Sequence, residues 1–285
     1  MSTFLLISII IGVSLQNIVK KAYNVKVGGG VFIFSGLSSA FAALFFILSS
    51  IGTFEFNAEF LPYSVGFSVF YSMGVAFSVL AILTGPLSLT SLITSYSLVI
   101  PAVYGIAMLG EDISKTLIIG IILLMISLFF VNMEKKDDKK ITLKWGIYVF
   151  LAFLGNGGCS TVQKVQQVDL SGAYKNEFMI IALLITTATM LIVAAISERD
   201  KFGISIKKGF FWYAVCGIAN GIVNLMVMML TTNYNMPASV MFPLISAGGI
   251  ILTVAVSMTL YKEKLTKNQI FGVILGIGAI VLLNL

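Results

Sequence analysis

The sequence predicts an all-α membrane protein in which ten transmembrane helices form two inverted five-helix repeats. Three observations lead to this prediction. The 285 residues are 58% apolar and only 11% charged, and their mean hydropathy of +1.03 is far from that of a soluble globular domain. The apolar residues fall in runs long enough to cross a bilayer. One charged and then apolar stretch occurs twice, once in each half of the chain.

Apolar runs of membrane-spanning length supply the ten predicted helices. A bilayer core about 30 Å thick requires roughly 20 apolar residues in a helix, and a helix satisfies its own backbone hydrogen bonds. The runs are too long for barrel strands and lack their alternation. The first run has no basic segment before it, so we expect a span and not a signal peptide. The predicted spans are about 2–20, 29–51, 62–84, 86–108, 116–133, 144–163, 176–197, 209–231, 237–260 and 267–284.

The repeated stretch divides the chain. Its two copies, 110–132 and 262–284, align Glu111 with Glu263, Lys115 with Lys267, and Gly120 with Gly272. Five spans lie on each side of the charged segment 134–143, which we expect to be a cytoplasmic linker between repeats 1–133 and 144–285. Because five is odd, the second copy enters the membrane in the opposite sense. The repeats are therefore inverted, and a central site is expected at their interface.

Basic residues predict the orientation of the chain. Fifteen of the eighteen Lys and Arg residues fall on one side, and only Lys115, Lys164 and Lys175 fall on the other. Lysine-rich loops usually stay in the cytoplasm. We therefore expect the lysine-rich loops in the cytoplasm, both termini outside, and the chain in the plasma or inner cell membrane.

Polar side chains recur at helical spacing on the first, third, fourth, sixth, eighth and ninth spans. Because polar groups in a bilayer face a bundle interior or a watery cavity, these six helices are the expected cavity wall. Amides are the costliest of these groups to bury, and each of them fits interhelical hydrogen bonding as well as solute contact. Taken together they favour a solute site on helices of both repeats: Gln16, Asn17, Asn156, Gln163, Asn220 and Asn224.

Five further residues complete the candidate substrate-binding set. Tyr71, Thr94 and Tyr96 lie on the polar faces of the third and fourth spans, and Lys20 and Lys164 lie near the ends of the first helix of each repeat. Hydroxyls in membrane helices usually bond back to their own helix, and a lysine near a helix end can extend to the interface. The alternative is that the two lysines attract a carboxylate or phosphate.

Glycine and proline predict local departures from regular helix. The stretch 155–159 weakens the sixth span at mid-depth, and Pro101 and Pro243 remove hydrogen bonds from the fourth and ninth spans. Spans five and ten carry almost no polar residues, so we expect them to be peripheral. Gly272 and Gly276 form a small-xxx-small pair there, which suits close packing on a neighbouring helix or on a second protomer. We expect a monomer or a homodimer through these two helices.

Composition also excludes several function classes. The chain has no His, and its two cysteines, Cys159 and Cys216, lie within apolar runs. We therefore expect no metal site, no disulfide scaffold and no cofactor. The basic residues lie in short loops, which fits membrane topology better than nucleic-acid binding. Without His or a deep carboxylate pair the common general bases are missing, so we do not expect an enzyme.

These features resemble a known family. Five spans occurring twice, Lys20 and Lys164 closing the first helix of each half, and the motif Glu-x-[Ile/Leu]-[Ser/Thr]-Lys-x4-Gly at 111–120 and 263–272 are similar to the drug/metabolite transporter superfamily, in particular its EamA-like members. The resemblance covers the whole chain. It implies a ten-helix fold that carries small metabolites by alternating access, often exporting amino acids or related compounds. Family members are expected to keep both termini in the cytoplasm, whereas the lysines here predict the reverse.

The favoured functional hypothesis is a carrier of a small polar metabolite, such as an amino acid or a similar neutral or zwitterionic solute, working in export or exchange. The predicted cavity holds amides, hydroxyls and tyrosines but few charges. No Asp, Glu or His lies deep in a span, which favours facilitated diffusion or exchange over proton coupling. Tyrosines can also face a cation, so a multidrug or organic-cation transporter is the alternative. A passive channel is a further one.

Overall fold

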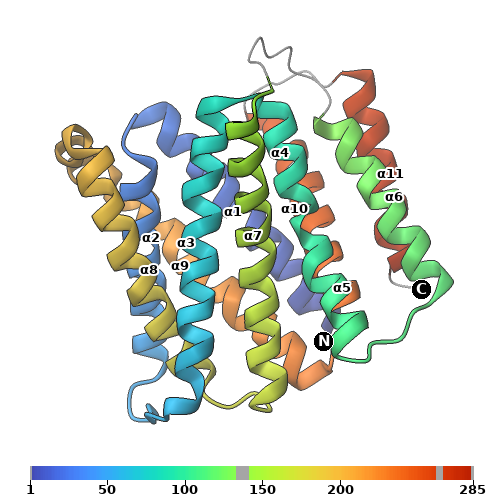
Figure 1. The fold of residues 1–285 in the computed structure, drawn as a ribbon, viewed down its shortest axis with the longest axis horizontal. Helices are drawn as coiled ribbons and strands as arrows, with labels where there is room; N and C mark the ends of the chain where they lie inside the picture. The colour runs from blue at the N-terminus through green and yellow to red at the C-terminus, as the bar shows by residue number, and fades with distance from the viewer. Residues whose placement is uncertain (1, 133–140, 261–265, 284–285) are drawn as a thin grey trace. The chain divides into compact units, whose positions relative to one another are not determined.

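The computed structural model describes residues 2–132, 141–260 and 266–283, and within them it contains helices and no strands (Figure 1). In this part of the chain eight helices are long and apolar enough to cross a membrane, and two shorter apolar helices cover Lys115–Val131 and Lys267–Leu283. The predicted fold class, an all-α membrane protein with about ten spans, is thereby confirmed.

The helices follow the predicted spans closely. Apart from the short 3-10 turns Ala58–Phe60, Tyr96–Leu98 and Arg199–Lys201, they are α1 (Ser2–Lys26), α2 (Val31–Ser49), α3 (Leu61–Thr84), α4 (Leu87–Ser95), α5 (Val99–Met108), α6 (Lys115–Asn132), α7 (Leu143–Asp169), α8 (Lys175–Ser197), α9 (Phe202–Tyr234), α10 (Ala238–Leu260) and α11 (Lys267–Leu283). Only the fourth predicted span is divided, into α4 and α5.

Proline and glycine act differently at the predicted irregularities. The turn Tyr96–Leu98 comes just before Pro101, because a proline ring crowds the carbonyl four residues earlier. Pro243 instead lies inside an unbroken α10. The prediction that glycines weaken the sixth span is wrong, since α7 is continuous through residues 155–159. A methyl group at Gly157 would lie 2.6 Å from the carbonyl oxygen of Ser97, so this glycine permits close helix packing.

Contacts divide the chain into two compact units. Unit 1 comprises Met1–Ser72 and Val162–Asn235, and unit 2 comprises Met73–Thr161 and Met236–Leu285. Each unit takes helices from both predicted repeats. The repeat boundary at 134–143, most of which lies outside the described residues, stays a prediction.

Unit 1 is built on α2, which packs against α8 and α9, while α9 also packs against α1. Small residues bring these helices together: Gly36 on α2 faces Leu191 of α8, and Gly217 on α9 faces the backbone of α2 at Ser38. The first half of α3 joins the unit through Ser64, whose hydroxyl donates to the Phe178 carbonyl at 2.9 Å. Packing through small residues is usual in membranes, where apolar burial does not drive helices together.

In unit 2, α6 and α11 lie side by side (Figure 1) and contact each other reciprocally. A methyl group at Gly120 would lie 2.9 Å from the Leu283 side chain, and one at Gly272 would lie 2.8 Å from the Val131 nitrogen. In the alignment of the two repeated stretches, Gly120 corresponds to Gly272 and Val131 corresponds to Leu283. The contact of Gly120 with Leu283 is therefore equivalent to the contact of Gly272 with Val131. Such paired contacts are what a two-fold relation between the two helices requires. Their glycine faces are thus used within the chain. A homodimer through α6 and α11 stays a prediction and would use their outer faces.

Candidate solute-binding site

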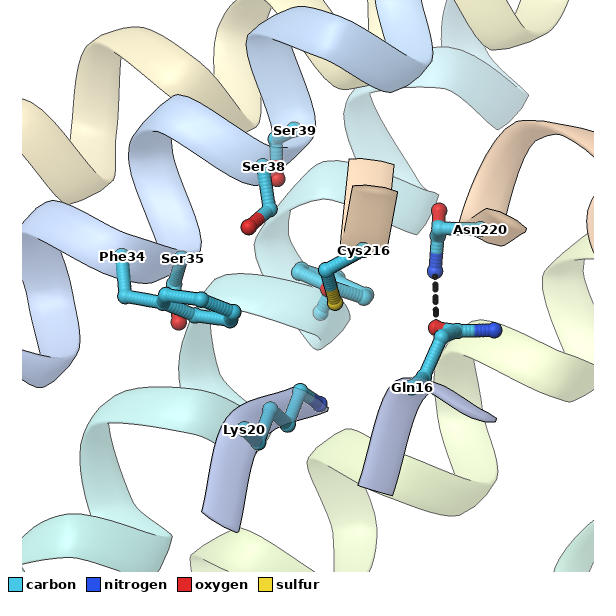
Figure 2. Close-up of a pocket in the computed structure, with 9 residues that line it drawn as sticks. Gln16, Lys20, Phe34, Ser35, Ser38, Ser39, Cys216 and Asn220 are labelled. Atoms are coloured by element: carbon cyan, nitrogen blue, oxygen red, sulfur yellow. Dashed lines mark hydrogen bonds between the residues drawn. The ribbon is translucent and has the colours of Figure 1, made fainter. Parts of the chain in front are cut away.

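A pocket in unit 1 is lined by side chains of α1, α2, α3 and α9 (Figure 2). It holds about 270 Å³ of empty space with its opening included, and the part that admits a water-sized sphere is about 10 Å³, roughly the room for one water molecule. Lys20 provides the one charge in its lining, which is otherwise polar and aromatic. The lining residues are Gln16, Lys20, Phe34, Ser35, Ser38, Ser39, Tyr71, Cys216 and Asn220.

Helical spacing explains how these residues meet. Gln16 and Lys20 are one turn apart on α1, and Cys216 and Asn220 are one turn apart on α9, so each pair shares a helix face. The intervening Gly217 lets α9 approach α2, because a side chain there would overlap the Ser38 carbonyl oxygen. The sequence thereby brings polar groups of three helices to one small space.

A chain of amide side chains runs from this pocket to α7. Asn220 donates to the Gln16 oxygen at 3.1 Å, Asn224 donates to the Asn220 oxygen at 3.0 Å, and Gln163 donates to the Asn224 oxygen at 3.0 Å. Figure 2 shows the first of these bonds beside Lys20 and Cys216. Four of the six amides predicted to form a site are therefore hydrogen-bonded in series.

Ser38 contributes a buried hydroxyl that lacks an ordinary partner. Its side chain is 7% exposed, and its oxygen has no hydrogen bond of standard geometry, although the weakly donating Cys216 thiol is near enough to interact with it. The second span, α2, was not among the six helices predicted to form the cavity wall, yet it lines this pocket. The available signal was the small and polar cluster Ser35-Gly36-Leu37-Ser38-Ser39 in an otherwise apolar span.

Comparisons with known proteins agree with this fold. A solved structure, titled only as the crystal structure of a protein, is similar over 100% of this chain and 98% of its own, with a TM-score of 0.77 and 12% identity. That likeness shows the fold alone. The model of the EamA-like transporter family matches residues 143–285, just over half of the chain. The chain belongs to the EamA-like transporter family. It is therefore a multi-pass membrane transporter of the drug/metabolite type. No curated protein matches the chain.

The two lysines that the EamA-like resemblance treats as equivalent have different surroundings. Lys20 is exposed and lines the pocket. Lys164 on α7 is only 5% exposed and is not among the pocket-lining residues. Of the pair, only Lys20 lines this pocket.

The collar glutamate of the EamA-like motif has a structural position. Glu111 accepts hydrogen bonds from the backbone nitrogens of Ala238 and Ser239, the latter at 2.9 Å. These nitrogens begin α10 and have no partner within the helix, and a carboxylate satisfies them and complements the helix dipole. Glu111 thus anchors α10 in unit 2. Its predicted counterpart Glu263 lies outside the described residues.

Other candidate residues lie away from the pocket. The Tyr96 hydroxyl donates to the Met125 carbonyl at 2.7 Å, and the Thr94 hydroxyl donates to the Thr90 carbonyl at 2.8 Å. Asn156 belongs with them to unit 2, and Asn17 is exposed on α1 outside the pocket lining. Solute contact by these four residues stays a prediction.

Metal-binding groups do not gather in the part of the chain that the structure describes. No cluster of three or more His, Cys, Asp or Glu side chains lies there with the geometry to hold an ion. Cys159 and Cys216 are both free thiols. The chemistry available at the pocket is therefore hydrogen bonding and one positive charge.

Proposed function

We propose that this protein carries a small polar metabolite, an amino acid or a similar neutral or zwitterionic solute, by alternating access in export or exchange. The observation that carries the proposal is the polar site of unit 1, in which Gln16 and Asn220 belong both to the pocket and to the amide chain. Polar groups in membrane helices are costly, and they mark solute paths. In a transporter, such a site can bind the solute on its path across the membrane.

The pocket of unit 1 is small. Space for about one water molecule cannot hold an amino acid, so the helices around the pocket must move apart for a solute to enter. A carrier makes that movement toward one side at a time. The absence of His from the chain and of carboxylates from the pocket lining supports exchange over proton coupling.

The alternative of an organic-cation transporter rests on the aromatic rings of Phe34 and Tyr71 in the lining. Lys20 opposes it, because a like charge in the same small space repels a cation. We therefore favour the neutral or zwitterionic solute. The inverted relation of the two repeats, cytoplasmic lysine-rich loops and external termini are parts of the same proposal.

Counterflow in proteoliposomes tests the proposal. Vesicles that contain the purified protein are preloaded with one unlabelled amino acid, and uptake of the same labelled amino acid is followed. A carrier shows faster uptake into preloaded than into empty vesicles. Equal uptake into both would indicate a channel, and uptake no faster than into protein-free vesicles for all twenty amino acids would contradict the proposed solute class.

We expect Gln16→Ala and Asn220→Ala to weaken solute binding while the protein still folds. Each change removes one end of the 3.1 Å bond between these amides at the pocket wall, and loss of a polar contact to a solute costs about tenfold in affinity or more. Titration of the purified variants measures the effect. Leu15→Ala is the control, because this neighbour on α1 is 40% exposed and does not line the pocket. Unchanged affinity in both amide variants would contradict the site assignment.

A further inference from the structure

We propose, on the basis of the proposed function, that the pocket recognises its solute by a carboxylate group held between the Lys20 ammonium and the Ser38 hydroxyl. Such a site recognises one chemical group, the carboxylate, and not polarity in general. It excludes alcohols, sugars and quaternary amines as preferred solutes. Its support comes from the charge of the pocket, from Ser38, and from the amide oxygens of the pocket wall.

The positive charge of the pocket favours binding of an anion. Lys20 carries the one charge among the nine lining residues, and no carboxylate balances it there. In Figure 2 the Lys20 side chain extends from α1 toward the space beside Cys216 and Gln16. An ammonium brings three hydrogen-bond donors, and a carboxylate is the acceptor that pairs with it most strongly. Binding of a carboxylate thus neutralises the pocket.

Ser38 supplies a second donor that is ready for a ligand oxygen. Its hydroxyl is more than nine-tenths buried, lines the pocket and lacks a standard hydrogen bond. The backbone at Ser38 is held in place by Gly217 of α9. A buried hydroxyl that makes no standard hydrogen bond gains one when a ligand oxygen binds it. Ser38, Lys20 and Cys216 line the same pocket.

The remaining wall suits the other end of a zwitterion. The Gln16 side-chain oxygen accepts one hydrogen bond from Asn220 and has a second lone pair. That oxygen, with the hydroxyls of Ser35 and Ser39, can accept hydrogen bonds from a solute ammonium. An α-amino acid therefore matches both the donor side and the acceptor side of the pocket.

Matched pairs of solutes that differ only at the carboxylate test the inference. The probes are phenylalanine, leucine and threonine with their carboxamides, each measured by counterflow and by thermal stabilisation of the purified protein. We expect the wild type to prefer each acid over its amide by about tenfold or more, because the amide lacks the charge that pairs with Lys20. Lys20→Gln should reduce this preference to less than about twofold, and Lys20→Arg should retain most of it. Ser38→Ala should weaken binding of the acid more than binding of the amide.

Lys26→Gln is the matched control, since Lys26 lies near the end of the same helix, over the Trp212 ring and outside the pocket. It should keep the wild-type preference. Thermal unfolding without solute shows whether each variant is folded, and Lys20→Arg and Ser38→Ala keep the test valid if Lys20→Gln does not fold. Equal transport of acids and amides by the wild type would overturn the inference and leave the proposed carrier intact. Failure of all twenty amino acids to show counterflow would instead contradict the proposed function.

Discussion

Gly217→Ala is expected to destabilise the protein more than any other single-methyl change in α9. The added methyl group would overlap the Ser38 carbonyl oxygen and lie 3.1 Å from the Ala42 nitrogen. These are backbone atoms of α2, so they cannot turn aside as the end of a side chain can. Overpacking of this kind costs about 1–3 kcal/mol and sometimes more, and we expect the upper part of that range with a clear fall in the thermal unfolding temperature.

The control for this change lies in the same helix. Gly203 of α9 has no atom within 4 Å of an added methyl group, so Gly203→Ala should leave the unfolding temperature unchanged or raise it, because alanine favours helix over glycine. If Gly217→Ala were as stable as Gly203→Ala, then α9 and α2 would not be packed as the structure shows. The walls of the pocket would then be misplaced as well.

Glu198→Ala is the second change with a large expected effect. The Glu198 carboxylate follows α8 and accepts hydrogen bonds from three nitrogens at the start of α2: Val31 at 2.7 Å, Phe32 at 2.9 Å and Ile33 at 3.0 Å. Loss of a helix cap costs about 1 kcal/mol, and hydrogen bonds to a charged group cost more to lose. We expect a loss of about 2–3 kcal/mol, measured as a shift in chemical or thermal unfolding in detergent.

Two comparisons make the effect of Glu198 specific. Asp200→Ala removes an exposed carboxylate two residues away and should have little effect. Glu198→Gln keeps one acceptor oxygen and should fall between wild type and Glu198→Ala. If Glu198→Ala and Asp200→Ala unfolded at the same temperature, the carboxylate would not hold α2 to α8.

The fold class was predictable because membrane spans depend on a strong and local property. A helix in lipid must be apolar over roughly 20 residues, so composition and run length identified the spans. The clustering of the amides could also be predicted from the sequence, because buried amides need hydrogen-bond partners. In the structure the amides bond to one another: Gln163, Asn224, Asn220 and Gln16.

Other parts of the site depend on which helices become neighbours, and periodicity within one span does not contain that information. Ser38 gave little signal because serine in a membrane helix commonly bonds to its own backbone; its role depends on the approach of Gly217 from α9. Tyr96 has the spacing of a cavity residue, yet its hydroxyl reaches the Met125 carbonyl of α6. The composition of unit 1, which joins α1 and α2 to α8 and α9, likewise follows from tertiary packing.

Labelling of Cys216 from the two sides of the membrane tests most directly whether the pocket alternates its access. Cys216 lines the pocket, and in the Cys159→Ser background it is the one thiol of the chain. A membrane-impermeant anionic methanethiosulfonate is applied to sealed vesicles of each orientation, with and without the transported amino acid. We predict modification from either side and slower modification when the amino acid is present. Modification from one side only, or from neither, would contradict an alternating-access carrier with this pocket at its centre.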